Sequence, residues 1–375
     1  MADLLGVIHA SEVIVCCGSG GVGKTTTAAV LGLEAAALGR RVVVVTIDPA
    51  RRLADALGLS DGLAAEPQRI ELDTGETGEI QETDGAGELW AMMLDTAATF
   101  DGLVARHAAD PDQVDRILHN PLYRNMASAM SGTQEYMAAE TLHSLHGDDR
   151  FDLVIVDTPP SRNALDFLEA PGVLARFLDH RAFKLLMLPT KGSLRVLGSA
   201  AQPILKAIGR IVGSDVLADA VAFFQAFSGM ESGFRERADD VVALIRAPET
   251  SFVVVASPRH DTIGEAVWFA EQLVEQNVGV EAAIVNRTQP AFGTGTAEHA
   301  AAAADAASET GDAVLTSLWR NVTELATLRE RELEVLAPLA AVVGADVVAT
   351  LPLLDSDVHD LDGLLTIADH LFGRA

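Results

Sequence analysis

The most informative stretch of the sequence reads Gly18-Ser19-Gly20-Gly21-Val22-Gly23-Lys24-Thr25-Thr26. An apolar run, Val13–Cys17, precedes it, and a helical pattern that begins at Thr25 follows it. The stretch matches the phosphate-loop pattern G-x-x-x-x-G-K-[ST] in the order that this pattern requires, which is strand, loop and then helix. Glycines let successive backbone N–H groups turn toward a phosphate, and the helix N-terminus adds partial positive charge. The sequence therefore predicts a loop that binds the phosphates of a nucleotide.

Two side chains of this loop carry its chemistry. Lys24 supplies a point charge for the β- and γ-phosphates, and the Thr25 hydroxyl is a ligand for Mg²⁺. A glycine-rich turn without a ligand fits less well, because both flanks and the complete G-K-T are present. The residues that we expect to contact the nucleotide here are Gly20, Gly21, Val22, Gly23, Lys24, Thr25 and Thr26.

Two aspartates stand where a P-loop enzyme needs carboxylates. Asp157 follows the apolar run Phe151–Val156, and the C-terminal end of a buried strand is the position of a Walker-B aspartate. Asp48 ends a second such run and is placed to face the γ-phosphate. Either aspartate alone also fits a helix cap or a turn, but both together with the loop favour a catalytic site. The predicted magnesium ligands are Thr25, Asp48 and Asp157, and the predicted catalytic residues are Asp48 and Lys24.

Short apolar runs alternate with helical patterns along the chain. Most of these runs are continuously apolar, which is typical of strands that are covered on both faces in a parallel sheet. The alternation predicts a doubly wound α/β fold with right-handed crossovers, built as a single P-loop domain over residues 1–375. The predicted strands are Val13–Cys17, Arg41–Ile47, Asp152–Val156, Ser251–Ala256, Glu281–Val285 and Asp346–Leu351.

Three stretches depart from this alternation. Residues 61–88 contain nine acidic residues and one arginine, which indicates an acidic surface loop. Residues 291–312 are rich in alanine and glycine and are expected to form a flexible connection with a short Ala-rich helix. Residues 172–248 are apolar with helical spacing, which predicts a helical subdomain inserted between two strands.

The composition limits the partners and the compartment. The chain carries 27 Lys+Arg against 54 Asp+Glu, a net charge of −27, which argues against a nucleic-acid partner. No stretch of about 18 apolar residues lacks charge, so no transmembrane span is expected, although peripheral membrane contact stays open. The two cysteines, Cys16 and Cys17, are adjacent and cannot form a disulfide framework or a four-ligand zinc cluster. The sequence thus predicts a cytoplasmic protein whose two cysteines lie in the core.

The motifs taken together resemble a known family. The phosphate loop, T-x-D-P-A at 46–50, V-D-T-x-P at 156–160, I-V-N at 284–286 and L-P-L at 351–353 occur in the order found in the ArsA/GET ATPases. These dimeric proteins of the deviant-Walker P-loop class include the arsenite-pump ATPase and the tail-anchored-protein targeting factor. The resemblance covers residues 10–60, 88–290 and 345–372. Stretches of the sequence such as DTPPSRNALDFLEAP at 157–171 and GTQEYMA at 132–138 are most similar to actinobacterial ArsA-like ATPases, which are often labelled anion-transporting.

The resemblance implies ATP and Mg²⁺ as cofactors and gives roles to single residues. Asp48 would orient the attacking water, and Asp157 would hold Mg²⁺ through water. Asn286 would recognise adenine, with Pro352 and Leu353 forming the rest of the adenine pocket. An amide suits this role because it can donate and accept on one base edge. From the sequence alone, Asn286 fits equally well as a turn residue that ends a strand.

Departures from the family pattern are as informative as the matches. The family's second lysine, which crosses the dimer interface to the partner's nucleotide, is Ser19 here. Either the chain is one half of a heterodimer whose homologous partner supplies that lysine, or it is a slow or regulatory ATPase that pairs with itself. We favour the heterodimer. The family's switch II histidine is also missing, with Arg162 and Asn163 in that segment, and the lack of a C-x-x-C pair predicts that zinc is not used.

The family suggests an activity for the whole chain. The leading hypothesis is a switch ATPase that closes as a dimer around ATP and couples closure to a protein or membrane-protein client. In the targeting members, helices after switch II form an apolar client groove, which would be residues 172–248 here; plain packing of these helices is the alternative. The rival functions are a regulatory or scaffold subunit with negligible hydrolysis and the ATPase subunit of an anion efflux system. A partitioning ATPase would need a basic C-terminal helix, whereas Leu361–Ala375 has one arginine and two aspartates.

Overall fold

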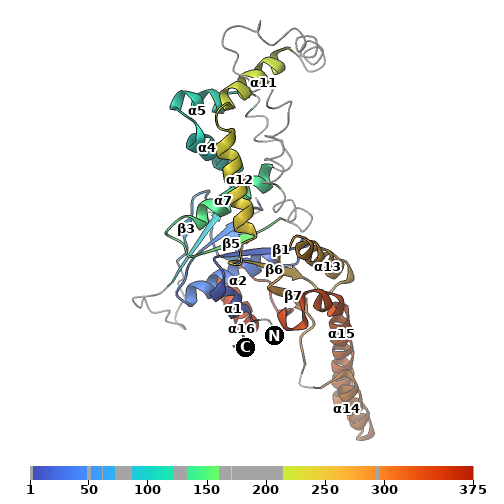
Figure 1. The fold of residues 1–375 in the computed structure, drawn as a ribbon. Coiled ribbons are helices and arrows are strands. Elements are labelled where there is room, and N and C mark those ends of the chain that lie inside the picture. The colour runs from blue at the N-terminus through green and yellow to red at the C-terminus, as the bar shows by residue number, and fades with distance from the viewer. Residues whose placement is uncertain are drawn as a thin grey trace. The chain divides into compact units, whose positions relative to one another are not determined.

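The computed structural model describes residues 3–48, 52–60, 62–71, 87–121, 123, 133–159, 170, 214–292 and 295–374 (Figure 1). Its contacts divide the chain into two compact units. The first unit comprises Met1–Met93, Leu145–Leu165 and Pro248–Ala375, and the second comprises Leu94–Ser144 and Asp166–Ala247. The sequence predicts one domain with residues 172–248 inserted as a helical subdomain. In the structure, Leu94–Ser144 belongs to the same unit as most of that subdomain, which the sequence did not predict.

The first unit is built on an eight-stranded sheet in the order β3-β4-β2-β5-β1-β6-β7-β8. Every neighbouring pair is parallel except β3 and β4, which are antiparallel. This arrangement confirms the predicted α/β fold with a mostly parallel sheet. The strands are β1 Val13–Gly18, β2 Arg41–Thr46, β3 Gln68–Arg69, β4 Glu88–Met93, β5 Leu153–Asp157, β6 Thr250–Ala256, β7 Ala282–Thr288 and β8 Val348–Pro352.

Helices of the first unit pack on this sheet and extend from it. Ile14 and Cys16 of β1 share one buried cluster with side chains of α2 and α16, so these two helices cover one face of the central strand. Figure 1 shows α13 on the opposite side of β1 and β6 from α2. The helices of this unit are α1 Leu4–Ala10, α2 Lys24–Ala37, α3 Arg52–Ala56, α13 His260–Glu275, α14 Ala297–Glu309, α15 Ala313–Val343 and α16 Leu361–Leu371, with a 3₁₀ turn at Ala345–Val347.

The two expected surface segments contain regular structure that the sequence analysis did not assign in full. Residues 61–88 include β3, which pairs with β4, and they end on the first residue of β4. Residues 72–86 of that segment lie outside the described part of the chain. The Ala/Gly-rich segment 291–312 contains α14, a helix of 13 residues. Alanines along one face of α14 are buried, and α14 packs along α15.

The second unit is helical and has a core of its own. Its helices are α4 Thr96–His107, α5 Pro111–Leu118, most of α7 Thr133–His146, α11 Ser214–Phe227 and α12 Glu231–Ile245. Phe223, Phe227, Met230 and Phe234 are buried in one cluster with side chains of α4, α5 and α7. In the described part of the expected subdomain 172–248, these apolar side chains therefore pack against the other helices of the same unit. Residues 172–213 of that subdomain lie outside the described residues.

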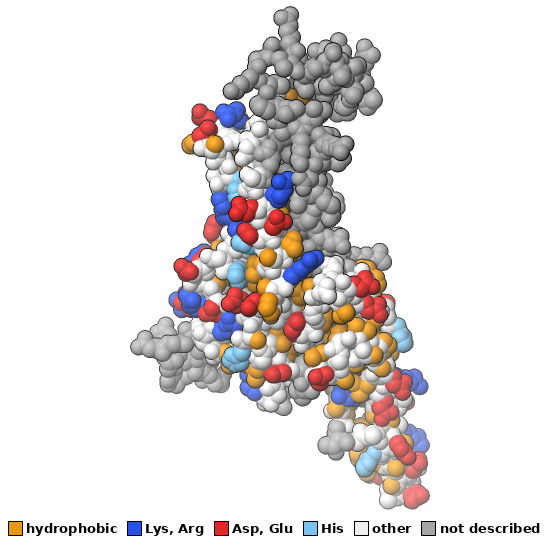
Figure 2. Space-filling model, viewed as in Figure 1, with side chains coloured by type: hydrophobic (Ala, Val, Ile, Leu, Met, Phe, Trp, Pro, Cys, Tyr) orange, Lys and Arg blue, Asp and Glu red, His pale blue; other side chains and the backbone are white. Residues whose placement is uncertain are grey.

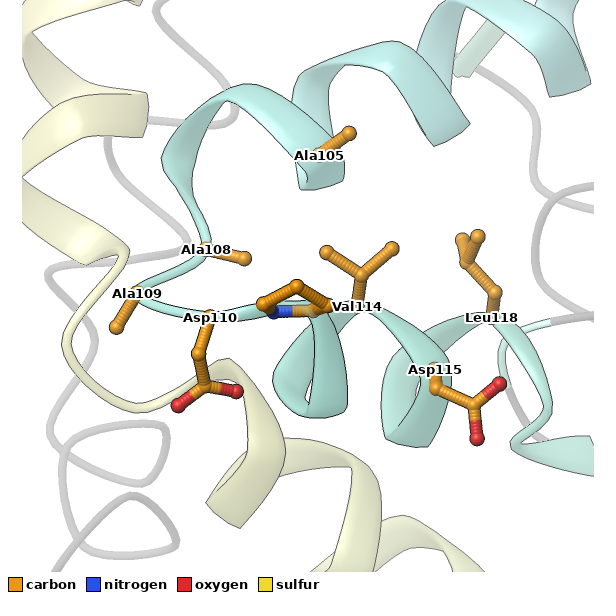
Figure 3. A pocket seen from close by; sticks show the side chains of 8 residues that line it. Ala105, Ala108, Ala109, Asp110, Val114, Asp115 and Leu118 are labelled. Carbon is orange, nitrogen blue, oxygen red and sulfur yellow. The ribbon is translucent and has the colours of Figure 1, made fainter.

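A hollow of about 450 Å³ lies where α4 turns into α5 in the second unit. Val114 and Leu118 point toward the end of α4 that carries Ala105, whereas the carboxylates of Asp110 and Asp115 point away from it (Figure 3). Most of the lining residues are apolar, and Asp110 and Asp115 are the two that carry a charge.

The surface agrees with the charge balance of the sequence. On the face shown in Figure 2, acidic and basic side chains of the described residues are interspersed, and no broad basic area stands out. Within the same part of the chain, no helix has the length and apolar character needed to cross a membrane.

Gly18 is a position where the parallel sheet depends on a missing side chain. Its φ is +147°, and a Cβ atom there would lie 2.0 Å from the Val255 carbonyl oxygen of β6. We expect Gly18→Ala to lower the free energy of unfolding by about 3 kcal/mol, because β1 and β6 would have to separate. Chemical denaturation measures this loss. Gly264→Ala in α13 is the matched control: a Cβ there meets nothing within 4 Å, so an equal loss in both variants would contradict the explanation.

Candidate nucleotide-binding site

The phosphate loop joins the central strand of the sheet to a buried helix. β1 ends at Gly18 and α2 begins at Lys24, so the loop occupies the space at the carboxyl end of β1. Gly21 and Gly23 have φ values of +76° and +101°, which a residue with a side chain rarely adopts. At Gly23 a Cβ atom would lie 2.3 Å from the Asn286 amide nitrogen. Gly23 is therefore required by the close approach of β7 as well as by the turn, and Gly21 by the turn alone.

Lys24 is held across the loop by the backbone. Its Nζ atom donates a hydrogen bond of 2.9 Å to the carbonyl oxygen of Ser19. The residue is buried, and this burial lowers the pKa of the ammonium group, while the nearby Asp157 acts in the opposite direction. A buried ammonium that donates to a neutral carbonyl would gain from an anionic oxygen placed beside it.

Asp157 stands at the centre of the predicted magnesium site. The hydroxyls of Thr25 and Thr46 both donate to its Oδ2 atom, at 2.7 and 2.9 Å. Its Oδ1 atom is buried, and none of the described residues forms a hydrogen bond with it. Burial is the main cause that raises the pKa of this carboxyl, and the two hydroxyl donors counteract it.

The Asp157 environment fits Mg²⁺. A buried carboxylate oxygen without a donor is costly, and a hydrated hard cation beside it would supply the missing donors. Mg²⁺ commonly takes one or two protein ligands together with phosphates and waters. No cluster of three or more His, Cys, Asp or Glu side chains suited to a metal occurs among the described residues. The predicted ligands Thr25 and Asp157 are in direct contact here, whereas Asp48 stays a predicted ligand at the same edge of the sheet.

Asp48 lies at the same edge of the sheet. It follows β2, which neighbours β5, and Thr46 of β2 is in register with Asp157. Its backbone N–H donates to the Thr46 hydroxyl at 3.3 Å, and its carboxylate lies 3.5 Å from the guanidinium of Arg52. Its side chain is 27% exposed, so water can reach it. Because the strands are parallel and adjacent, their carboxyl ends bring Lys24, Asp157 and Asp48 to one region.

The residues expected to contact adenine line one pocket beside the phosphate loop. This pocket has a volume of about 210 Å³, and Asn286, Pro352 and Leu353 line it together with Gly23 and Thr26. The Asn286 amide nitrogen donates to the Val22 carbonyl oxygen at 2.9 Å. The other lining residues are Arg287, Leu351, Leu354, Ser356, Asp357, Val358, His359 and Ile367.

Two residues that contact the loop, Glu265 and Arg287, could not be predicted from the sequence. The Ser19 hydroxyl donates to the Glu265 carboxylate at 2.6 Å, although the two residues are 246 positions apart. The Arg287 guanidinium donates to the Gly21 carbonyl oxygen at 3.3 Å. Neither contact follows a short motif, so only the fold reveals it. Cys16 and Cys17 are fully buried, and burial raises the pKa of both thiols, which places them in the core and not at a reactive site.

The magnesium assignment can be tested at Asp157. We expect Asp157→Asn to raise the Mg²⁺ concentration needed for half-maximal ATP turnover by at least about tenfold, as found when residues that orient a metal shell are changed. A metal titration of the steady-state rate measures the shift. Asp149→Asn, on an exposed turn of the same unit, is the control. Equal metal requirements in both variants would remove Asp157 from the metal site.

The sheet order and the converging side chains define a P-loop nucleotide hydrolase. The chain matches the model of the anion-transporting ATPase family, ArsA_ATPase, over residues 11–297, and it belongs to that family. This confirms the resemblance drawn from the motifs, and the chain is accordingly an ATPase.

Individual relatives bear two kinds of name. The ATPase GET3 of Rhodotorula glutinis is 26% identical over 271 residues, which cover 72% of this chain and 68% of the relative. The putative arsenical pump-driving ATPase 1 of Aquifex aeolicus is 26% identical over 280 residues, which cover 74% of this chain and 64% of the relative. The ATPase get3 of Aspergillus terreus is 28% identical over 273 residues, covering 72% and 71%. The matched part thus spans about two thirds of each relative.

Proposed function

We propose that this chain is a Mg²⁺-dependent switch ATPase that closes as a dimer around ATP in the cytoplasm. The observation that carries the proposal is the convergence of Lys24, Thr25, Asp157 and Asp48 at the carboxyl ends of β1, β5 and β2. Lys24 and the loop amides would bind the phosphates, and Thr25 with Asp157 would hold Mg²⁺. Asp48 would orient the attacking water. Zinc has no part in this proposal.

We further propose that the partner is a homologous subunit that carries the lysine absent at Ser19. In this chain the Ser19 side chain is buried and donates to Glu265 of the same subunit. It therefore offers no cation to a nucleotide held by another subunit. A lysine-bearing partner would supply one to the nucleotide bound here, where charge stabilisation accelerates phosphoryl transfer.

The decisive experiment measures ATP turnover of the purified chain alone and after mixing with a family paralogue that has a lysine at this position. We expect slow turnover alone and a stimulation of at least about a hundredfold in the mixture. The matched control is the same paralogue with that lysine changed to alanine, which should not stimulate. A chain that forms a stable dimer with itself and turns over equally fast alone would contradict the heterodimer.

A second candidate is a nucleotide-dependent scaffold subunit with negligible hydrolysis, which Ser19 also favours. It predicts background turnover in both mixtures and no effect of Asp48→Asn on any measured rate. The names of the relatives suggest two processes to which ATP hydrolysis could be coupled. One is the binding of a protein client, and the other is anion efflux. A defined probe separates them: a peptide with one transmembrane segment should bind the dimer in an ATP-dependent manner, whereas an efflux subunit should instead change its turnover with the anion.

A further inference from the structure

Arg287 has an unusual backbone conformation at the edge of the candidate site. Its φ is +62°, in the left-handed region that residues with long side chains seldom occupy. The register between β7 and β8 shifts at the same place, with Asn286 opposite Leu351 and Thr288 opposite Pro352. Arg287 is therefore the extra residue of a β-bulge. Bulges of this kind occur next to active sites, where they redirect a side chain.

The residues on both sides of Arg287 hold the bulge in place. The Asn286 amide donates to the Val22 carbonyl oxygen at 2.9 Å, which ties the strand to the phosphate loop. The Thr288 hydroxyl donates to the Leu351 carbonyl oxygen at 3.1 Å, and the Leu353 N–H donates to the Thr288 carbonyl oxygen at 2.8 Å. A strained residue persists only where its surroundings fix it so firmly, and such strain is found at functional sites.

The bulge turns the Arg287 side chain toward the phosphate loop. Its guanidinium donates to the Gly21 carbonyl oxygen at 3.3 Å, and the residue lines the pocket that also includes Gly23 and Thr26. A guanidinium has five N–H donors, so one bond to Gly21 leaves most of them for a ligand. Arg287 is exposed, whereas Lys24 is buried beneath the loop. Two cationic side chains therefore contact the same loop, one exposed to solvent and one buried.

We propose that Arg287 binds the phosphate chain of the nucleotide from the outer side of the loop and slows its release. The inference rests on the proposed nucleotide site. It assigns phosphate and not the base to Arg287, because the anchoring bond is to Gly21 within the phosphate loop and not to the Pro352–Leu353 wall. The other ionisable side chains that line the pocket are Asp357 and His359, which follow β8. Arg287 is the lining residue with a permanent positive charge, and its fork of donors suits phosphate oxygens.

The test uses Arg287→Gly, Arg287→Ala and Arg287→Lys in the full chain, with ATP, ADP and adenosine as probes in equilibrium binding. We expect Arg287→Gly and Arg287→Ala to weaken ATP and ADP about tenfold or more and to leave adenosine binding unchanged. Arg287→Lys should retain part of the affinity, because a point charge remains without the fork. Arg320→Ala, an exposed position on α15, controls for the loss of one positive charge.

Arg287→Gly also separates binding from folding. Glycine adopts a positive φ without strain, so this variant should unfold at the same or a higher temperature than the parent while losing phosphate affinity. Equal losses for adenosine and ADP would overturn the assignment to phosphate in favour of the base. Unchanged ATP affinity in all three variants would remove Arg287 from the site altogether. If the parent itself bound no ATP, the proposed function would fail instead, which distinguishes the two failures.

Discussion

Lys24→Ala should abolish ATP turnover, with a fall in kcat/KM of at least about a hundredfold. The reason is that the Lys24 ammonium lies within the phosphate loop, 2.9 Å from the Ser19 carbonyl oxygen, and removing one group that stabilises the transferred phosphate costs about two to three orders of magnitude in comparable sites. Steady-state kinetics with excess Mg²⁺ measures the loss. Arg320→Ala is the control for a general effect of charge and should leave kcat/KM unchanged.

The same substitution should separate function from stability. Among the described residues, the buried Lys24 ammonium donates to the Ser19 carbonyl oxygen, and burial lowers its pKa, so its removal relieves an unfavourable burial of charge. We expect Lys24→Ala to melt no lower than the parent without nucleotide and to lose the rise in melting temperature that ATP gives the parent. A variant that melts much lower without ligand, yet still gains stability from ATP, would show that Lys24 has a structural role instead.

Asp48→Asn is expected to keep ATP binding and lose hydrolysis. Asparagine has nearly the same shape as aspartate, so the van der Waals contacts of the side chain are preserved. It lacks the negative charge needed to orient and activate a water. We expect kcat to fall by about two orders of magnitude while the Kd for ATP changes less than about threefold. Single-turnover kinetics and equilibrium binding measure the two quantities separately.

Two control variants sharpen this result. Asp55→Asn changes an exposed aspartate of α3, the helix that follows Asp48, and should have no effect. Arg52→Ala removes an ion partner of Asp48; the Arg52 side chain is exposed and the two groups are 3.5 Å apart, so a small effect is expected. Parallel losses of binding and hydrolysis in Asp48→Asn would instead assign this aspartate to nucleotide binding.

Strands were predictable where their composition was distinctive. β1, β2 and β6 are rich in valine, and each was expected within one or two residues of its observed bounds. β4 was missed because Glu-Leu-Trp-Ala-Met-Met contains no β-branched residue, although Leu89 and Ala91 are buried as firmly as the valines. β3 has only two residues, too few for any periodicity. Its pairing with β4 depends on the tertiary structure and not on the local sequence.

The site divides in a similar way between local and distant signals. The phosphate loop is a contiguous motif, and Asp157 follows a buried strand, so both could be recognised along the chain. Arg287 could not, because its direction depends on a register shift between β7 and β8 that no local pattern encodes. Glu265 reaches Ser19 only because α13 packs beside β1 and β6. Such residues become visible when strand pairing and helix packing are known.

The candidate pocket has a consequence for how the protein is made. Gly23 and Thr26 are synthesised well before Pro352 and Ile367, which line the same pocket. Side chains of α16, including Leu364, share the buried cluster of α2, so the helix that carries the phosphate loop stays uncovered on that face until α16 has left the ribosome. A nascent chain would therefore emerge with its nucleotide motif complete before the helix behind that motif has its packing partner. Synthesis interrupted before Leu361 would leave a protein with the motif but without Ile367 in the pocket and without the side chains of α16 that cover α2.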